Sequence, residues 1–476
     1  MDTEPENTLR LLLATDNHLG YLEKDPVRKD DSFLAFEEIL SIAQREKVDM
    51  ILLGGDLFHD NRPSRKALFT TMKLFRQYCM GDQPSAVRFC SDASATLENS
   101  FGSVNYQDPN LNVGIPVFTI HGNHDDPTGD GNLSAIDLLS VTGQLNYFGK
   151  SQQVDRVEIK PLLLQKGSTK LALYGLGNIR DERLHRTFLS KKVNTIRPET
   201  TPADWFNLLV LHQNRIAHGP TNFIPEEFLD SLFDLVMWGH EHECRIDPEP
   251  NSTRGFAVTQ PGSSVATSLC DGESRTKHVA LLSLHQRDYR LRKIRLKFVR
   301  PFLLEDVALR DIPGLEPLDE RGTMNFLRKK VDDMIERTMT TWLSEMGYGF
   351  DQNDLPEGLR CMQLPLIRLR VDYSGGFTSF NPQRFGMHYT DRVANPKDII
   401  YYHRRKVTNG PPSRTSLKSG TAADQPASVE DIDSVGIEDL INEFLEGQVL
   451  DVFIDRELNE AVRLFVDKEE PHAIVQ

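Results

Sequence analysis

The stretch Met50-Ile51-Leu52-Leu53-Gly54-Gly55-Asp56-Leu57-Phe58-His59-Asp60 decides the fold. It begins as an unbroken apolar run, which predicts a strand buried on both faces. Two glycines follow, and they let the backbone turn sharply before the carboxylate of Asp56. Open α/β sheets collect ligands at the carboxyl ends of their strands, so Asp56 is a candidate metal ligand. The alternative is that Asp56 caps the next turn, and this stretch alone does not decide between the two.

Length and composition bound the possible functions. The chain has 476 residues, enough for about three domains and a large core. No apolar run approaches the length of a membrane span, and the acidic N-terminal segment does not resemble a secretory signal. Five cysteines without CxxC spacing favour a reducing intracellular compartment over a disulfide or zinc-finger framework. The formal net charge is −15, so any nucleic-acid contact must depend on local basic segments.

Hydrophobic patterning predicts strands alternating with helices up to about residue 300. A strand, a helix and a strand in this order imply a parallel, right-handed unit. Short turns separate the later strands, at 255–260, 277–285 and 288–299, which predicts antiparallel pairing. The earlier strands are expected at 9–16, 48–55, 115–120, 154–164, 169–176, 205–211 and 234–238, and the helices at 30–47, 64–79 and 133–145.

Some surface features have two interpretations. Helices 64–79 and 133–145 carry more apolar surface than one core-facing stripe needs, so they are either well buried or a self-association surface. The polar segment 80–112 is long for a loop in a compact domain, which indicates a functional or disordered segment. Basic residues gather at 180–197, at 287–300 and at 403–406, either as solvated faces or as phosphate contacts.

After residue 300 the pattern changes. Helix 320–346 and strand 364–373 predict a smaller α+β domain, and the Gly, Pro, Ser and Thr-rich composition that follows predicts a flexible linker. The amphipathic helices beyond it cannot bury their apolar faces alone, so they dock on a partner or fold back on the main body. The expected organisation is a first domain at 1–299 with an insertion at 80–112, a second at 300–406, a linker at 407–429 and a helical element at 430–470.

Seven polar residues lie at the ends of five predicted strands, and together they indicate a metal centre. Imidazoles, carboxylates and one amide oxygen are the ligands of a binuclear site, and mixed nitrogen and oxygen donors suit Mn²⁺, Fe or Zn²⁺ better than Mg²⁺ or Ca²⁺. Two such ions predict phosphate-ester hydrolysis, because they activate water and spread negative charge. A single histidine at a strand end is more often structural, but seven such residues are hard to explain as coincidence. The seven are Asp16, His18, Asp56, Asn123, His212, His240 and His242.

These residues lie in segments that resemble a known family. Asp16-Asn17-His18, Gly55-Asp56, Gly122-Asn123-His124-Asp125, His212 and Gly239-His240-Glu241-His242 resemble the signature of the calcineurin-like metallophosphoesterases. Matches at 57–60, 120–127, 222–226, 371–377 and 391–396 are similar to the eukaryotic meiotic-recombination-eleven nucleases of double-strand-break repair. The resemblance covers nearly the whole chain. It implies an α/β sandwich of two sheets flanked by helices, a smaller α+β capping domain and C-terminal helices.

The resemblance also implies roles for the site residues. One Mn²⁺ would be bound by Asp16, His18, Asp56 and His242, and a second by Asp56, Asn123, His212 and His240, with Asp56 bridging. His124 would face the phosphodiester and assist the leaving oxygen or the transition state, and His59 would lie near the scissile phosphate. For both histidines the alternative is that they support the ligands and transfer no proton.

Function and partners follow from the same resemblance. It implies a nuclear, Mn²⁺-dependent nuclease of DNA ends, a 3′–5′ exonuclease on duplexes and an endonuclease on single strands. It implies a homodimer through helices 64–79 and 133–145, DNA binding by the capping domain 300–406, and no membrane contact. Segment 80–112 would contact a regulatory subunit of the Nijmegen breakage syndrome type, and 430–467 the coiled-coil root of an SMC-like ABC ATPase. Two alternatives stay open, a phosphomonoesterase on the same metal core and a scaffold for DNA ends and an ATPase.

Overall fold

The computed structural model describes residues 4–97, 101–128, 130–151, 153, 155–217, 219–347 and 362–404. The chain divides into two compact units, Met1–Val407 and Thr408–Gln476, and every described residue belongs to the first. The predicted linker at 407–429 and helical element at 430–470 lie outside the described residues. None of the described helices is long and apolar enough to cross a membrane.

The opening stretch forms strand β2 (Met50–Leu53), whose four residues are all buried, at the middle of a six-stranded sheet. Strands β1, β2, β4 and β5 are parallel, whereas β14 runs antiparallel to β1 and β15 antiparallel to β14. The order is β15-β14-β1-β2-β4-β5, with β1 (Thr8–Ala14), β4 (Val117–Thr119), β5 (Asn146–Tyr147), β14 (His278–His285) and β15 (Asp288–Arg295).

A seven-stranded sheet forms the second layer of strands. Its centre is parallel, and antiparallel strands border it. The predicted strand 255–260 is β13, which is parallel to β11 and antiparallel to β12. It lies in a different sheet from β14, so the predicted antiparallel pairing is wrong for 255–260 and confirmed for 277–285 with 288–299. The chain between β11 and β13 contains β12 and is long enough to cross over. The order is β12-β13-β11-β10-β8-β7-β3, with β3 (Arg88–Phe89), β7 (Pro161–Lys166), β8 (Thr169–Leu176), β10 (Phe206–His212), β11 (Leu235–Gly239), β12 (Arg245–Pro250) and β13 (Ala257–Gln260).

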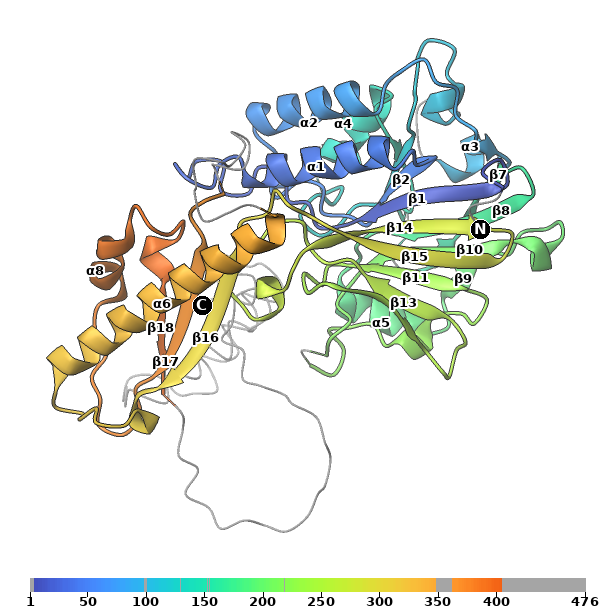
Figure 1. Ribbon diagram of the computed structural model, residues 1–476. Helices are drawn as coiled ribbons and strands as arrows, with labels where there is room; N and C mark the ends of the chain where they lie inside the picture. The colour runs from blue at the N-terminus through green and yellow to red at the C-terminus, as the bar shows by residue number, and fades with distance from the viewer. Residues whose placement is uncertain are drawn as a thin grey trace, which may run out of the picture. The chain divides into compact units, whose positions relative to one another are not determined.

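Alternate side chains of the strands serve different cores. Leu52 points between the two sheets, whereas Ile51 points to the helices on the outer face of the first sheet. Figure 1 shows α1 (Asp31–Arg45), α2 (Arg65–Tyr78) and α4 (Ala135–Val141) over the first sheet and α5 (Asp181–Leu189) beneath the second. A third core, around Tyr174 and Trp238, fills the outer face of the second sheet. The expected sandwich of two sheets flanked by helices is confirmed.

Helix boundaries agree with the predictions except at α4. The Ser64 hydroxyl accepts the N–H of Ala67 and caps α2. Helix α4 is shorter than the predicted 133–145, because a capping box at Ser134 starts it and Gly143, in the left-handed region, follows its end. Leu133 therefore precedes the helix.

Two segments are less regular than the sequence suggested. The predicted strand 154–164 is two strands, because β6 (Val157–Ile159) pairs with β9 (Val193–Thr195) away from both large sheets, whereas β7 joins the second. In segment 80–112 the described residues include β3, α3 (Ala93–Thr96) and the 3₁₀ turn Asn105–Gln107. Val87, Leu97 and Val104 of this segment are buried in the core between the sheets. Their spacing has no period, so the sequence pattern did not show their burial.

A smaller α+β arrangement follows, as expected. Strands β16 (Phe302–Ala308), β17 (Leu366–Asp372) and β18 (Ile400–His403) form a parallel sheet, and α6 (Glu320–Met346) packs on one face of it. The short helix α8 is Pro382–Gly386. The buried Arg300 donates to Asp31 of α1, at 2.6 and 2.9 Å, and to the carbonyl of Leu364. This buried ion pair connects the smaller arrangement to the first sheet.

Candidate metal centre

The seven predicted ligands meet at one edge of the sandwich. Each follows, or ends, a buried parallel strand: β1 and β2 and β4 in the first sheet, β10 and β11 in the second. The carboxyl ends of parallel strands share an edge, and two stacked sheets bring two such edges together. The structure therefore brings seven residues together at one site: the buried Asp16, His18, Asp56 and His212, the half-buried His240 and His242, and the exposed Asn123.

Ligand atoms of three residues form a first cluster, Asp16, His18 and His242, within 4.8 Å of one another. The Nε2 atoms of His18 and His242 are 3.0 Å apart, and His242 Nε2 is 3.6 Å from Asp16 Oδ1. Asp16 Oδ1 is buried and has no hydrogen-bond partner among the described residues. A buried carboxylate oxygen without a donor, facing imidazole nitrogens, fits a cation site.

Asp56, His212 and His240 form a second cluster on the same distance criterion. His212 Nε2 lies 3.2 Å from Asp56 Oδ2. Asn123 Oδ1 completes this cluster, 3.2 Å from His212 Nε2 and 2.9 Å from His240 Nδ1. The amide oxygen of Asn123 and the carboxylate oxygen of Asp56 thus both lie 3.2 Å from His212 Nε2, as donors around one ion would.

Asp56 belongs to both clusters by position. Its Oδ2 atom is 3.2 Å from His212 Nε2 and 3.8 Å from His18 Nε2. Its Oδ1 atom accepts the backbone N–H of His124 at 2.9 Å, which fixes the carboxylate. One oxygen of Asp56 therefore faces the two clusters at once.

The backbone of the centre is strained. Asp16, His18, Asp56 and His240 have φ of 51°, 46°, 49° and 80°, in the left-handed region. Each such residue costs on the order of 1–3 kcal/mol and persists only where its surroundings impose it. Gly55 is also left-handed, and a Cβ there would lie 2.5 Å from His212 Nδ1. The turns that aim these side chains are thus held by the packed strands around them.

Hydrogen bonds on the outer ring nitrogens orient two imidazoles. His212 Nδ1 donates to the Gly54 carbonyl at 2.9 Å, and His242 Nδ1 donates to Glu273 at 2.8 Å. With the proton on Nδ1, each Nε2 lone pair points into its cluster, which is the tautomer that metal binding requires.

Opposite charges inside the centre perturb its pKa values. Burial lowers the pKa of His212, but Asp56 and Asp16 raise it to about 10. Burial and His242 hold the pKa of His18 well below its ordinary value. Burial acts to raise the pKa of Asp56, but His212 holds it well below its usual range. The Asp56 carboxylate is therefore charged and attracts a proton or a cation, and a bound cation would displace the proton on His212.

Both predicted catalytic histidines border the first cluster. The rings of His59 and His124 stack at 5.0 Å, and the ring of His18 lies 4.9 Å from that of His124. His124 Nδ1 donates to the carbonyl of His59 at 2.7 Å. The structure thus brings both imidazoles to the centre, in a position compatible with either of the roles left open.

Comparison with known proteins identifies the family. The family model for calcineurin-like phosphoesterases matches residues 9–244, and the one described as the Mre11 DNA-binding presumed domain matches residues 289–465. The double-strand break repair protein MRE11 of Mus musculus is 48% identical over 99% of this chain, which covers 66% of that protein. The MRE11 of Homo sapiens is 47% identical over 99% of this chain, which covers 65% of that protein. The MRE11 of Coprinopsis cinerea is 43% identical over 99% of this chain, which covers 67% of that protein.

The chain belongs to the MRE11 family of double-strand break repair proteins. It spans about two thirds of the length of the curated relatives that it matches. The resemblance stated from the motifs is confirmed, and so is the calcineurin-like metallophosphoesterase fold. The fold and the two clusters support a site for a divalent metal.

Sequence reasoning about this MRE11-family chain missed two carboxylates. Asp125 lies in the motif Gly122-Asn123-His124-Asp125, but the sequence predicted no role for it. Its carboxylate accepts the N–H groups of Leu57 and Gly122 at 2.7 Å each. It therefore connects the turn after β2 with the turn after β4. Glu273, which contacts His242, lies in the 3₁₀ turn Gly272–Ser274 and follows no strand, so no local signal marked it.

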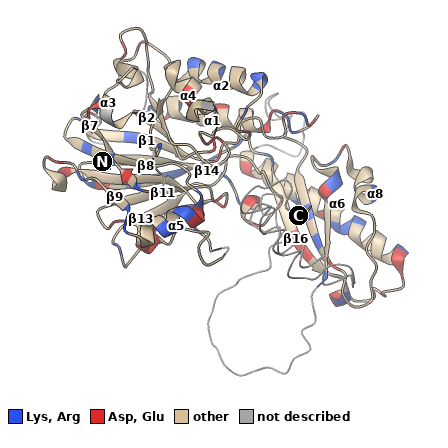
Figure 2. Ribbon diagram, turned by 180° about the vertical axis from the view of Figure 1, so that it is seen from behind, with Lys and Arg blue, Asp and Glu red and all other residues tan. Residues whose placement is uncertain are grey.

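The basic segments carry less uncompensated charge than the sequence suggested. On β15, Lys293 pairs with Asp247 at 2.7 Å and Arg295 with Glu345 at 2.5 Å. In the segment 180–197, Arg183 pairs with Asp155 at 3.0 Å. Figure 2 shows basic and acidic residues interspersed on the face in view. Acidic side chains from other elements thus pair with basic residues that looked uncompensated in the sequence. A DNA phosphate could bind these basic residues only by replacing their acidic partners.

Proposed function

We propose that this chain is a Mn²⁺-dependent nuclease that hydrolyses phosphodiesters at DNA ends. The observation that carries the proposal is the Asp56 carboxylate, one oxygen of which faces two separate ligand clusters. A bridging carboxylate between two sets of nitrogen and oxygen donors is what a two-ion site requires. The names of the relatives, which are double-strand break repair proteins, support DNA as the substrate class.

The proposed ligand sets follow the two clusters. One ion would be held by Asp16, His18, Asp56 and His242, and the other by Asp56, Asn123, His212 and His240. When bound, two such ions lower the pKa of water and stabilise the charge that builds on the phosphate during displacement.

The chain's own residues position the reaction. Asp125 holds the turns after β2 and β4 in register, so that Asp56 and Asn123 keep their places. The Nδ1 proton of His124 is engaged by the carbonyl of His59. We assign to His124 the contact with the phosphodiester and the assistance of the leaving oxygen, and to His59 a place beside the scissile phosphate.

Domains and partners are proposed on the same basis. The first domain, 1–299, would carry the chemistry, and the capping domain, 300–406, would hold DNA. Cleavage would be 3′–5′ on duplex ends and endonucleolytic on single strands, in the nucleus. The helical element 430–470 would dock, through residues 430–467, on the coiled-coil root of an SMC-like ATPase.

Exposed apolar residues support two further interfaces. Phe69 on α2 is 69% exposed and Leu138 on α4 is 51% exposed, although both are large and apolar. The proposed homodimer would bury them through segments 64–79 and 133–145. In segment 80–112, Phe101 is 63% exposed and is a candidate contact for the Nijmegen breakage syndrome-type subunit.

One experiment tests the function. End-labelled duplex DNA and p-nitrophenyl phosphate are each incubated with the chain and Mn²⁺, beside His124→Asn and a control, His285→Asn. His285 pairs with Thr8 at the start of β1, so it lies at the end of the sheet away from the centre. We expect the wild type and the control to degrade DNA and His124→Asn to lose at least about 100-fold in rate. Intact DNA with bound Mn²⁺ would refute the nuclease, and turnover of the monoester alone would indicate a phosphomonoesterase. Equal DNA degradation by His124→Asn would refute the role given to His124.

A further inference from the structure

Glu273 is a buried carboxylate directly behind one candidate ligand. It is 2% exposed, and its Oε1 atom accepts the Nδ1 proton of His242 at 2.8 Å. The same oxygen accepts the backbone N–H and the hydroxyl of Thr267, each at 3.0 Å. With the backbone N–H of Ser268 at 3.4 Å, four donors fix this oxygen on the outer side of the imidazole.

The other oxygen of Glu273 is equally constrained. Its Oε2 atom accepts the Ser263 hydroxyl at 2.9 Å and forms an ion pair with Lys277, which is 3% exposed. The Lys277 ammonium also donates to Ser263 Oγ at 2.7 Å and to the His242 carbonyl at 3.3 Å. The charge of Glu273 is therefore compensated by a buried cation. Burial acts to raise the pKa of Glu273, but Lys277 and His242 hold it well below its ordinary value.

Other imidazoles of the centre have different outer partners. His212 donates to the neutral carbonyl of Gly54, and His18 Nδ1 lies 3.3 Å from His59 Nδ1. His240 Nδ1 faces into its own cluster, toward Asn123 Oδ1. Within the described residues, His242 is the candidate ligand whose ring nitrogen contacts a carboxylate from outside the two clusters. A carboxylate in that position fixes the ring and makes the opposite nitrogen a stronger donor.

We propose that Glu273 is a positioning residue that makes the two metal positions unequal. It aims His242 Nε2 at Asp16 and His18 and strengthens the binding of the ion at that cluster, relative to the ion at the cluster of Asp56, Asn123, His212 and His240. The inference rests on the proposed two-ion site. It adds that the position at the cluster of Asp16, His18 and His242 fills first. The first cluster would act as the tight, resident site and the second as the weaker, exchangeable one.

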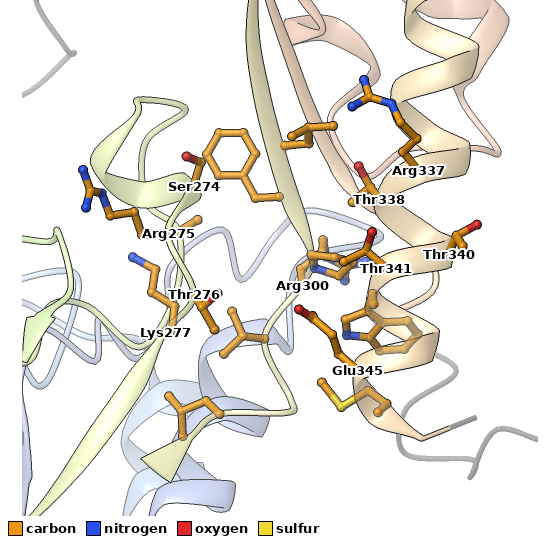
Figure 3. A pocket seen from close by; sticks show the side chains of 18 of the residues that line it. Ser274, Arg275, Thr276, Lys277, Arg300, Arg337, Thr338, Thr340, Thr341 and Glu345 are labelled. Carbon is orange, nitrogen blue, oxygen red and sulfur yellow. The ribbon is translucent and has the colours of Figure 1, made fainter. Parts of the chain in front are cut away.

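Glu273 and Lys277 also line a cavity of about 680 Å³ that none of the seven candidate ligands lines. Figure 3 shows Lys277 on one wall of this cavity and Thr338 and Thr341 of α6 on the opposite wall. A substitution of Glu273 therefore acts on the centre through the His242 ring, without removing a side chain that belongs to either cluster.

The test is a Mn²⁺ titration of metal-free chain, followed by the electron paramagnetic resonance signal of free aqueous Mn²⁺. Wild type is expected to bind two ions with separate affinities. Glu273→Gln keeps the shape but removes the charge, and it is expected to weaken the tighter of the two affinities by about 10–100-fold and leave the weaker one unchanged. Weakening of the weaker affinity alone would contradict the assignment of the tight site to the first cluster. Equal weakening of both sites, or no change in either, would overturn the role of Glu273. Wild type that binds fewer than two ions would instead overturn the proposed two-ion function, and this inference with it.

Two control variants separate positioning from general destabilisation. Asp31→Asn removes another buried carboxylate, paired with Arg300 and in neither cluster, and it is expected to lower the melting temperature without changing either Mn²⁺ affinity. Lys277→Gln leaves Glu273 uncompensated beside His242 and is expected to lower the melting temperature without weakening the tight site. A loss of the tight site in Lys277→Gln equal to that in Glu273→Gln would show that loop stability, and not the carboxylate, sets the affinity.

Discussion

Replacement of Gly122 by alanine should disable the centre without altering any candidate ligand. A Cβ at this position would lie 2.0 Å from Asp56 Oδ1 and 2.5 Å from Asp56 Cγ, whereas ordinary contacts begin at 3.4 Å. The φ of Gly122 is not in the left-handed region, so the conflict is steric and concerns Asp56 alone. The carboxylate or the turn must therefore move by roughly 1 Å or more.

Asp56 has little room for that movement. It is buried, its Oδ1 atom is held by the N–H of His124, and its Oδ2 atom lies between His212 and His18. A misplacement of about 1 Å in such a site costs about 100-fold in rate, and overpacking costs about 1–3 kcal/mol of stability. We expect Gly122→Ala to lose at least about 100-fold in Mn²⁺-dependent DNA degradation and to bind both ions more weakly.

The assay compares DNA degradation, Mn²⁺ stoichiometry and urea unfolding for this variant and Gly81→Ala. A Cβ at Gly81 would meet no heavy atom within 4 Å, so this control should match the wild type in all three measurements. Wild-type activity and two tightly bound ions in Gly122→Ala would refute the conclusion that Asp56 must lie where the structure places it.

Three further predictions concern stability and assembly. Arg300→Met removes the nearer of the two buried cations beside Asp31, because Arg28 stays 3.5 Å from the same carboxylate. It is expected to lower the free energy of unfolding by about 1.5–3 kcal/mol in urea titrations, and an unchanged midpoint would contradict the burial of this pair. Burial raises the pKa of the Asp181 carboxyl to about 6, above its ordinary value of 3.8. Because the folded state favours the protonated carboxyl, the stability that Asp181 contributes is present below about pH 4 and is lost as the pH rises through about 6. Asp181→Asn should therefore gain roughly 2–3 kcal/mol relative to wild type between pH 4 and pH 8. Phe69→Glu combined with Leu138→Glu should convert a dimer to a monomer in light scattering after gel filtration, and an unchanged mass would contradict the interface proposed for α2 and α4.

Local pattern was sufficient for the central strands of both large sheets, for the main helices and for the choice of the seven candidate ligands. It missed the short strands β3, β5 and β9, missed β12, and merged β6 with β7. An apolar run that ends in glycine and a carboxylate or histidine reports a buried strand and its end, because both depend on neighbours in the chain. Helix α6 occupies the predicted range 320–346, since its cap and its apolar spacing are local. The opening stretch accordingly predicted strand β2 and the candidate ligand Asp56.

Tertiary structure alone decided how these residues combine. The grouping into two clusters depends on the packing of one sheet's edge against the other, since His212 and His242 come from a different sheet than Asp16 and Asp56. The same holds for Glu273 behind His242 and for the acidic partners of the basic strand β15, which come from distant parts of the sequence. Such contacts are long-range, so no spacing along the chain encodes them. The sequence by itself therefore determined which residues reach the centre, and the packing of the two sheets determined which of them lie together.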